Sequence, residues 1–213
     1  MTTAPRSERP QAKKKPTTPR RNTTPPGEIR LIGGLWKRTK LPVADKPGLR
    51  PTPDRVRETL FNWLGQDLTG WRCIDAFAGT GALGFEAASR GAAEVIIVEQ
   101  DGILVSQLMA TQKKLAASAV QVRRGDGVGQ LRQLAPASQD AVFLDPPFDA
   151  EVYEPALRAA AAAIKPDGQI YLEAGQRWTD EALAEIGLAL HRHLKAGAVH
   201  AHLLRRLPDT ATA

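Results

Sequence analysis

The sequence predicts an α/β protein with a Rossmann-like, doubly wound and mostly parallel sheet that closes in a C-terminal antiparallel hairpin. From residue 71 onward, apolar runs typical of strands alternate with longer segments typical of helices. The strand runs lack a clean apolar–polar alternation, as expected when helices cover both faces of a parallel sheet. A basic β-hairpin and a helix are expected ahead of this body.

Five strands and four connecting helices are expected in the body of the chain. The strands are predicted at residues 72–77, 94–99, 120–124, 140–145 and 169–174. The helices are predicted at residues 82–90, 101–117, about 127–134, and 151–164. Strands that alternate with helices in this way form right-handed crossovers and a parallel sheet. The segment 188–207 then forms a hairpin with its turn at Ala196-Gly197.

The chain is expected to divide into three parts. Residues 1–27 contain six prolines, seven Lys or Arg and almost nothing apolar. Such a segment buries too little surface to offset its ordering entropy, so we predict a disordered tail. Residues 28–66 are predicted to form the basic hairpin and helix, and residues 67–213 the main domain.

The helix of the N-terminal extension lies in the segment GLRPTPDRVRETLFNWLG, residues 48–65. Thr52 is expected as its N-cap, with Pro53 in the first turn. Val56, Leu60 and Leu64 recur at helical spacing and predict one face directed to the core.

Positive charge is concentrated near the N-terminus. Residues 1–58 contain 15 Lys or Arg and 5 Asp or Glu, whereas the whole chain has a net charge of +6. The imbalance indicates a polyanionic partner that meets this part of the chain, or else a solubilising tail. Arg57 and its neighbours could be a solvated helix face, but as a group beside the hairpin they favour phosphate binding. The candidate contacts are Arg30, Lys37, Arg38, Lys40, Arg50 and Arg55.

Cysteine content and hydropathy indicate the compartment. The chain has one cysteine, Cys73, and no apolar stretch close to the roughly 18 residues of a membrane span. No signal peptide is evident either. We therefore expect a cytoplasmic protein that has no membrane partner.

The stretch DAFAGTGALG, residues 75–84, carries a complete G-x-G-x-x-G pattern. The pattern predicts a ligand that lies against a turn between a strand and a helix, although alone it is weak evidence for which ligand. A dinucleotide would bring its pyrophosphate close to the carboxylate of Asp75, and like charges at short range are unfavourable. A ligand with an ammonium and a sulfonium group finds the same carboxylate favourable. The residues thus favour S-adenosylmethionine over a nicotinamide cofactor.

Two further acids follow the next strands. Glu99 lies 20 residues after Gly79 and could accept both ribose hydroxyls of either cofactor, so it does not discriminate. Asp126 could accept from an adenine amino group, or could simply be the N-cap of a helix.

The stretch DAVFLDPPF carries a second pattern at a strand end, Asp145-Pro146-Pro147-Phe148. An exocyclic amine of a nucleobase is a poor nucleophile and needs fixed acceptors around it, which the Asp145 carboxylate and the Pro146 carbonyl would supply. The prolines stiffen the turn and remove N–H donors. Phe148 offers a face on which an extruded base can stack. Asp-Pro-Pro could also be only a strand terminator.

Four blocks occur here in an order that resembles one family: IRLIGGLWKRTKLPV, GLRPTPDRVRETLFNWL, DAFAGTGALGFEAASRGA and FLDPPF. They are similar to the bacterial 16S rRNA guanine-N2 methyltransferases of the RsmD family, over about residues 29–205. The resemblance implies a class I methyltransferase that uses S-adenosylmethionine. Its acceptor would be N2 of one guanine, guanine 966 in the family's rRNA numbering. The partner would be 16S rRNA in the 30S subunit or its assembly intermediate, and we expect a monomer.

The resemblance also implies the site residues. The acceptor pocket is expected to contain Asp145, Pro146, Pro147 and Phe148. The cofactor site is expected to contain Asp75, Phe77, Gly79, Thr80, Gly81, Glu99, Gln100, Asp126, Gly127 and Thr52. A DNA or RNA adenine-N6 methyltransferase and a non-catalytic rRNA-binding assembly factor remain alternatives.

All four histidines lie in the last predicted hairpin. A turn at Ala196-Gly197 would pair His193 with His200 and His191 with His202, which places the four on one face. Four histidines on one face could bind zinc. An exposed polar row is the preferred interpretation, since no acid or thiol accompanies them, and we expect no metal site.

Overall fold

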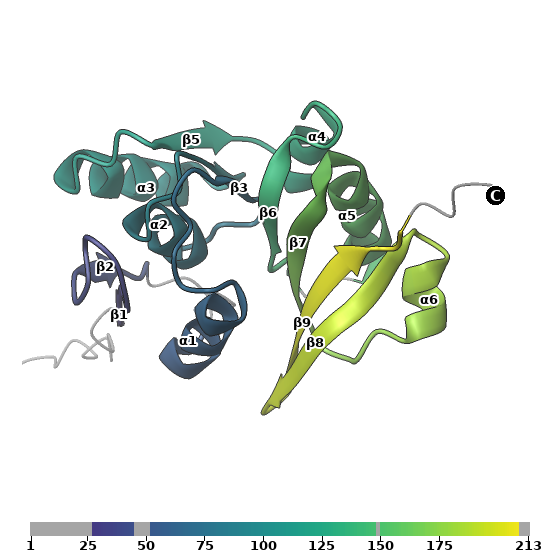
Figure 1. Ribbon diagram of the computed structural model, residues 1–213. Helices are drawn as coiled ribbons and strands as arrows, with labels where there is room; N and C mark the ends of the chain where they lie inside the picture. Colours follow the sequence, from purple (N-terminus) through teal and green to yellow (C-terminus); the bar gives the residue numbers. More distant parts are fainter. Residues whose placement is uncertain (1–26, 45–51, 148–149, 209–213) are drawn as a thin grey trace, which may run out of the picture.

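The computed structural model describes residues 27–44, 52–147 and 150–208. Its main sheet has seven strands in the order β5-β4-β3-β6-β7-β9-β8 (Figure 1). The strands are β3 (Arg72–Asp75), β4 (Glu94–Glu99), β5 (Val120–Arg124), β6 (Gln139–Leu144), β7 (Ile164–Ala174), β8 (Leu188–Ala196) and β9 (Val199–Arg206). The first five pair in parallel, and β9 pairs antiparallel with both β7 and β8. The predicted fold class is confirmed.

Helices cover both faces of this sheet because alternate strand residues are apolar in both directions. One core packs Cys73, Ile97 and Phe143 against helices that precede or follow the first two parallel strands. The opposite core packs Ile74, Ile96 and Val142 against the later helices. On the first face lie α1 (Asp54–Trp63), α2 (Ala82–Ser89) and α3 (Gly102–Lys114); on the second lie α4 (Gly127–Arg132), α5 (Ala150–Ala163) and α6 (Asp180–Ala184).

The N-terminal extension forms a small antiparallel pair, β1 (Glu28–Arg30) and β2 (Lys40–Pro42), followed by α1. Leu31, Leu60 and Phe61 are buried in the same apolar cluster as the first face of the main sheet. The loop after β1 is fixed to α2, since Ile32 and Gly33 both donate their N–H groups to the Glu86 carboxylate at 2.7 Å. The extension therefore rests directly on the helix that follows the glycine turn.

The helices and strands expected from the sequence are present, with boundaries shifted by a few residues. Two local predictions are wrong. Helix α1 has Pro53 as its N-cap and no side-chain cap, so Thr52 does not cap it. The last hairpin turns between Ala196 and Val199, which pairs His193 with His202 in place of His200.

A bulge explains the rest of the changed pairing in the last hairpin. The register shifts between Leu190 and Arg192, so His191 falls at the irregularity and faces no histidine. The short helix α6 was not predicted either, because five residues carry too little periodic pattern. The predicted tail, Arg50 and Phe148 lie outside the described residues, apart from Gly27 at the end of the tail. The three-part division of the chain stays a prediction.

None of the helices within 27–44, 52–147 and 150–208 combines the length and the apolar character needed to cross a bilayer.

Candidate active site

Acidic residues gather where the parallel strands end. Asp75 ends β3 and Glu99 ends β4, while Asp126 and Asp145 follow β5 and β6 directly. Because the carboxyl ends of parallel strands share one edge of the sheet, the fold brings these four predicted residues to one side of the molecule. The order β4-β3-β6 also places the topological switch point between β3 and β6, beside Asp75 and Asp145.

Asp75 lies at the centre of this edge and is only 1% exposed. Its Oδ2 accepts a 2.9 Å hydrogen bond from the N–H of Gly84 in α2. Burial, together with the nearby Glu99 and Glu173 carboxylates, raises the pKa of Asp75 to about 7 against the lowering effect of the Gly84 bond. A carboxylate in this position gains from a positively charged ligand.

The glycine turn runs from the end of β3 into α2. Gly81 has φ 75° and is the N-cap of α2, and a Cβ there would lie 2.5 Å from Leu108 Cδ2. Both the backbone conformation and the close packing require glycine at this position. The turn does not indicate a phosphate ligand, because the group next to it is the Asp75 carboxylate, which would repel a phosphate.

Glu99 and Asp126 have structural partners in this edge. Glu99 Oε2 accepts from Gly79 N–H at 2.9 Å and its Oε1 accepts from Asp101 N–H at 2.8 Å. Asp126 is the N-cap of α4, with its Oδ2 accepting from Gly129 N–H at 2.6 Å. The N-cap interpretation of Asp126 is thus confirmed, while contacts of either acid with a nucleoside stay a prediction. Each carboxylate oxygen keeps a second lone pair for such a contact.

The Asp-Pro-Pro corner follows β6 directly. Asp145 is partly buried, Pro146 is buried and Pro147 is exposed. Burial raises the pKa of Asp145 well above its ordinary value, and the Glu173 and Asp75 carboxylates raise it further, while a hydrogen bond with the Thr52 side chain lowers it. The corner therefore presents a carboxylate that is held in a desolvated and negatively charged environment.

The sequence analysis did not single out Glu173 or Tyr171, which belong to this cluster. Glu173 lies on β7, is 4% exposed, and accepts a 2.8 Å hydrogen bond from the Tyr171 hydroxyl. Burial raises the pKa of Glu173, against hydrogen bonds with Tyr171 and Thr52 that lower it. The available signal was an acid inside the apolar run QIYLEA, where a strand residue two places from a tyrosine must share its face.

The sequence suggested that Thr52 caps a helix, but the residue lies beside the acidic cluster instead. It is buried, and its side chain lowers the pKa of both the Asp145 and the Glu173 carboxyl groups. Its carbonyl accepts from Nε of Arg57 at 3.2 Å. Thr52 therefore joins the N-terminal extension to the acidic cluster of the main sheet.

The prediction that Arg57 belongs to a basic outer face is wrong. Its side chain is 0% exposed; Nη2 donates to the Arg30 carbonyl at 2.9 Å and to Asp54 Oδ1 at 2.6 Å. Nη1 lies 3.8 Å from Glu86 Oε2. Arg57 is a buried structural cation, and the helical spacing of the apolar residues Val56 and Leu60 gave no sign of the polar partners that surround it.

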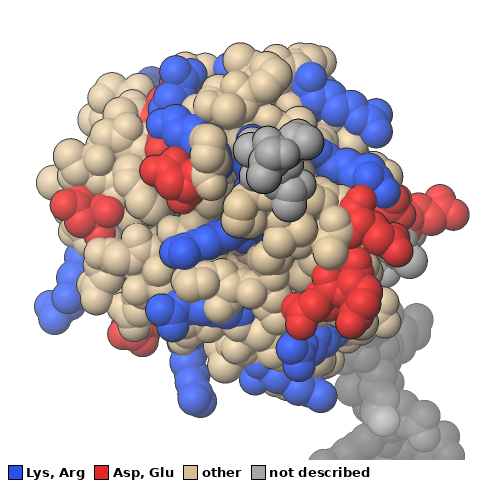
Figure 2. All heavy atoms as spheres, turned by 45° about the vertical axis from the view of Figure 1, so that its right-hand side comes forward, with Lys and Arg blue, Asp and Glu red and all other residues tan. Residues whose placement is uncertain are grey.

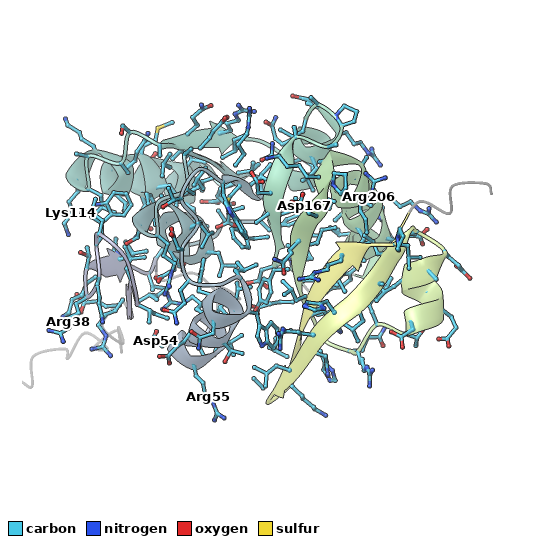
Figure 3. All side chains as sticks on the ribbon, in the orientation of Figure 1. Arg38, Asp54, Arg55, Lys114, Asp167 and Arg206 are labelled. Carbon is cyan, nitrogen blue, oxygen red and sulfur yellow. The ribbon has the colours of Figure 1, made fainter. Side chains whose placement is uncertain are left out.

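The other basic candidates are on the surface. Lys37, Arg38 and Arg55 are exposed, and Arg38 and Arg55 point away from the body in Figure 3. Arg30 lies 3.8 Å from Asp54, and Lys40 forms a 2.6 Å ion pair with Glu28. The face turned forward in Figure 2 shows Lys and Arg scattered among neutral residues, with one group of acids on the right and further acids on the left. The basic candidates thus remain free to meet a phosphate backbone at low energetic cost.

The histidines of the last hairpin form a compact group. His193 Nε2 and His200 Nδ1 are 3.0 Å apart, and the His193 and His202 rings are 5.0 Å apart. His202 accepts from Trp178 N–H at 3.2 Å, and burial lowers its pKa to about 4. Across the described part of the chain, no three His, Cys, Asp or Glu side chains are arranged to hold a metal ion.

The strand order, the glycine turn behind an acidic strand end, and the Asp-Pro-Pro corner define a methyltransferase of the Rossmann-like class. A family model described as "Conserved hypothetical protein 95" matches residues 29–205. A ribosomal RNA small subunit methyltransferase D of Escherichia coli is 39% identical over 184 residues, which cover 84% of this chain and 91% of the relative. The chain belongs to the ribosomal RNA small subunit methyltransferase D family.

Two further comparisons agree with this assignment. The relative of the same name from Haemophilus influenzae is 44% identical over 154 residues, which cover 69% of this chain and 79% of the relative. The solved structure of an Escherichia coli protein named methyltransferase yhhF has a TM-score of 0.74 and 39% identity, covering 85% of this chain and 99% of that one. The similarity therefore extends through both the N-terminal extension and the sheet.

S-adenosylmethionine is the methyl donor that this fold class implies, and the residues present fit it. Glu173 raises the pKa of both Asp75 and Asp145, and Asp75 raises that of Asp145, so negative charges repel one another at this edge. A sulfonium and an ammonium group would relieve that repulsion, whereas a pyrophosphate would increase it. Asp75 and the glycine turn would hold the methionine part, and Glu99 would hold the ribose.

Proposed function

We propose that this protein transfers a methyl group from S-adenosylmethionine to N2 of a guanine in 16S rRNA of the small ribosomal subunit, guanine 966 in the family's numbering. The names of the relatives support ribosomal RNA as the substrate. One observation carries the assignment of the reaction: the Asp145-Pro146 corner opens beside the buried Asp75 and Glu173 carboxylates. This arrangement supports a role for the corner as the acceptor of an amine, next to acids that would attract a cation.

The protein's part in this chemistry is to position the amine and to accept a proton. When bound, S-adenosylmethionine supplies an electrophilic methyl group on a positively charged sulfur. The Asp145 carboxylate and the Pro146 carbonyl accept hydrogen bonds from the target amino group, which orients its lone pair toward the methyl carbon. As the N–C bond forms, the amine becomes more acidic, and the Asp145 carboxylate accepts its proton.

The proposed partner is the 30S subunit or an assembly intermediate rather than free nucleotide. The exposed residues Lys37, Arg38 and Arg55 would contact phosphates and thereby position the RNA. In this proposal, the protein acts in the cytoplasm as a monomer. Phe148 and Arg50, outside the described residues, keep the proposed roles of a base-stacking face and a phosphate contact.

The decisive experiment is mass-spectrometric mapping of methylated nucleosides in small-subunit rRNA treated with the purified protein and S-adenosylmethionine. We expect N2-methylguanine at a single position, absent with the Asp145→Asn variant. N6-methyladenine would support the adenine alternative, and methyl-free rRNA bound tightly by the protein would support an assembly factor. The Asp167→Asn variant, which changes an exposed acid remote from the site, serves as the control.

A further inference from the structure

The C-terminal hairpin of β8 and β9 is a cationic element on an acidic body. Residues 59–187 contain 17 Asp or Glu and 10 Lys or Arg, whereas residues 188–207 contain four Lys or Arg, four His and no acid. The phosphate contacts proposed above all lie in the N-terminal extension, and the hairpin has no role among them. Cations gathered on one element of an otherwise acidic domain indicate an anionic partner for that element.

The strand register places the turn of this hairpin at the edge of the sheet where the candidate site lies. Ala174, the last residue of β7, pairs with His200 near the start of β9. The turn from Ala196 to Val199 therefore extends past the carboxyl end of β7, and Figure 1 shows it projecting beyond the rest of the sheet. Because β3, β6 and β7 are parallel, their carboxyl ends share this edge. The hairpin turn thus lies on the same side of the molecule as the Asp-Pro-Pro corner.

Two exposed cations lie beside this turn. Lys195 pairs with His200 across the hairpin. Arg177 follows shortly after the end of β7, and the next residue, Trp178, donates its N–H to Nε2 of His202 at 3.2 Å. Among the residues that the structure describes, neither Arg177 nor Lys195 has an ion-pair partner. Both side chains can therefore meet an external anion without breaking an internal contact.

The histidines beside the turn add to the positive field. His193 Nε2 and His200 Nδ1 are 3.0 Å apart, which fixes the two rings against each other. Burial lowers the pKa of His193, and positive charge on His200, Arg177 and Lys195 lowers it as well. Cationic groups therefore repel one another at the turn, and a phosphate group would relieve that repulsion.

Protection of the sheet edge explains only part of this pattern. β8 is the last strand in the order of the main sheet, and Lys or Arg on an edge strand prevents pairing with another chain. Lys195 lies on β8 and fits that function. Arg177 lies between β7 and α6, outside every strand, so edge protection does not account for it.

We propose that the hairpin turn is a second RNA-binding surface, on which Arg177 and Lys195 contact rRNA phosphates next to the target nucleotide. The proposal rests on the rRNA substrate proposed above. Helix α1, which carries the exposed Arg55, contacts β9, so the phosphate contacts of the extension and those of the hairpin lie on neighbouring elements. Phosphates held on both elements fix the path of the RNA backbone past the catalytic edge. This would favour extrusion of the nucleotide between them toward Asp145.

The first test is binding of the full-length protein to protein-free 16S rRNA over a salt series. The double variant Arg177→Ala, Lys195→Ala should lower the slope of log affinity against log salt by about 2, about 1 for each contact removed. Arg205→Ala is the matched control, because it removes an exposed cation at the other end of the same hairpin, where Arg205 pairs with Ala189. It should leave the slope unchanged.

Three outcomes of this test would overturn the proposal. The first is an equal slope in the double variant and the wild type. The second is an equal loss in Arg205→Ala, which would reduce the effect to net charge. The third is a loss of binding to complete small subunits with none to protein-free rRNA, which would assign the turn to a ribosomal protein.

The second test locates the turn on the RNA. The one cysteine of the chain, Cys73, is buried, so a cysteine introduced at the exposed turn by Ala198→Cys can be labelled selectively with an iron chelate that cleaves nearby RNA. We expect cleavage clustered around the methylated nucleotide in small subunits. Cleavage only in distant regions of the rRNA, or none, would contradict a contact beside the target.

Binding and methylation are measured separately, so the two proposals can fail separately. If the wild-type protein binds rRNA through Arg177 and Lys195 but methylates none of it, the proposed function fails and the RNA-binding turn stands. If the wild-type protein methylates rRNA and the double variant keeps the wild-type slope, the RNA-binding turn fails and the proposed function stands.

Discussion

The backbone N–H of Gly84 donates a 2.9 Å hydrogen bond to Oδ2 of Asp75, which ties the first turn of α2 to the end of β3. A Cβ at position 84 would lie 2.7 Å from Ile97 Cγ1 and 3.2 Å from that same carboxylate oxygen. The third glycine of the G-x-G-x-x-G pattern is therefore required so that α2 can pack on β4 and so that its own N–H can reach the Asp75 carboxylate. This differs from a phosphate-binding turn, in which the bare backbone faces the ligand.

Gly84→Ala should therefore weaken both the fold and cofactor binding. The Ile97 side chain must move to admit the methyl group, and overpacking of this kind costs about 1–3 kcal/mol of unfolding free energy. Displacement of α2 would also lengthen the bond to Asp75. Chemical denaturation and calorimetric titration with S-adenosylmethionine measure the two effects. Gly187→Ala has open space for its Cβ although its φ is 73°, so any loss there reports backbone strain alone.

Asp75→Asn should stabilise the unliganded protein at high pH. Burial raises the pKa of Asp75 from its ordinary value of 3.8 to about 7, so the folded chain holds the proton more tightly than the unfolded chain. Stability from this group is complete below about pH 4 and is lost as the pH rises to about 7, by roughly 4 kcal/mol at most. Asparagine still accepts from Gly84 and has no charge to desolvate. The variant should exceed wild type at pH 8 and approach it at pH 4.5, by denaturant unfolding.

The same variant should lose affinity for S-adenosylmethionine, because an attractive carboxylate has been removed. In the wild type, cationic ligand binding should release protons from the cluster near neutral pH, since a nearby positive charge lowers a carboxyl pKa. Titration in buffers of different ionisation enthalpy detects that release. A variant that is neither stabilised at pH 8 nor weakened in binding would show that Asp75 is not the charged group of this site.

Asp145→Ala should nearly abolish methyl transfer while S-adenosylmethionine binding is largely retained. The carboxylate acts on the amine, so its loss affects a group that contacts the acceptor, and the contribution of such proton acceptors is about 10²–10⁴-fold. Single-turnover rates and calorimetric affinities, measured on the same preparation, separate the two functions. Loss of cofactor affinity with unchanged turnover at saturation would reverse the assignment of Asp145.

In the Glu86→Gln variant, the N-terminal extension should detach from the sheet at a lower denaturant concentration than in the wild type. Glu86 is 0% exposed and accepts from Ile32 and Gly33 and from Nε of Arg90 at 2.9 Å. An amide cannot accept from all of these donors, the Arg90 guanidinium would lose its counter-charge, and the buried Arg57 would keep only Asp54 as an ionic partner. Removing one partner of a buried ion pair costs about 3–5 kcal/mol. Tryptophan fluorescence follows the transition, and a variant as stable as the control Glu58→Gln, which changes an exposed acid on α1, would contradict this structural role.

The sequence was sufficient for the sheet because its signals are local. Runs such as EVIIVE and DAVFLD are apolar throughout, and Gly91 or Asp101 mark the ends of the adjoining helices. The chemistry at Asp75 and Asp145 could be inferred for a related reason, since the carboxyl ends of parallel strands must meet. The topology of the sheet determines which strand ends lie side by side, and side-chain packing does not enter.

Glu173, Thr52 and Arg57 could not be assigned in this way, because their roles depend on contacts between distant segments. Thr52 precedes a helix and so resembles a cap, yet its side chain lowers the pKa of carboxyl groups about 90 and 120 residues away. Arg57 is charged and was therefore expected on the surface, whereas its buried partners, the Arg30 carbonyl and Glu86, come from distant segments. The hairpin register failed because the turn lies one residue later than predicted, between Ala196 and Val199, and because a bulge between Leu190 and Arg192 shifts the remaining pairs.

Arg38→Ala combined with Arg55→Ala should weaken rRNA binding mainly through its salt dependence. Both side chains are exposed and project from the N-terminal extension (Figure 3), so each would replace condensed counterions at a phosphate. The slope of log affinity against log salt should fall by about 1 for each contact removed, while the unfolding free energy and S-adenosylmethionine affinity stay unchanged. Filter binding to small-subunit rRNA over a salt series measures the slope. Lys114→Ala at the far end of α3 is the control, and an equal slope in all three proteins would assign RNA contact to another surface.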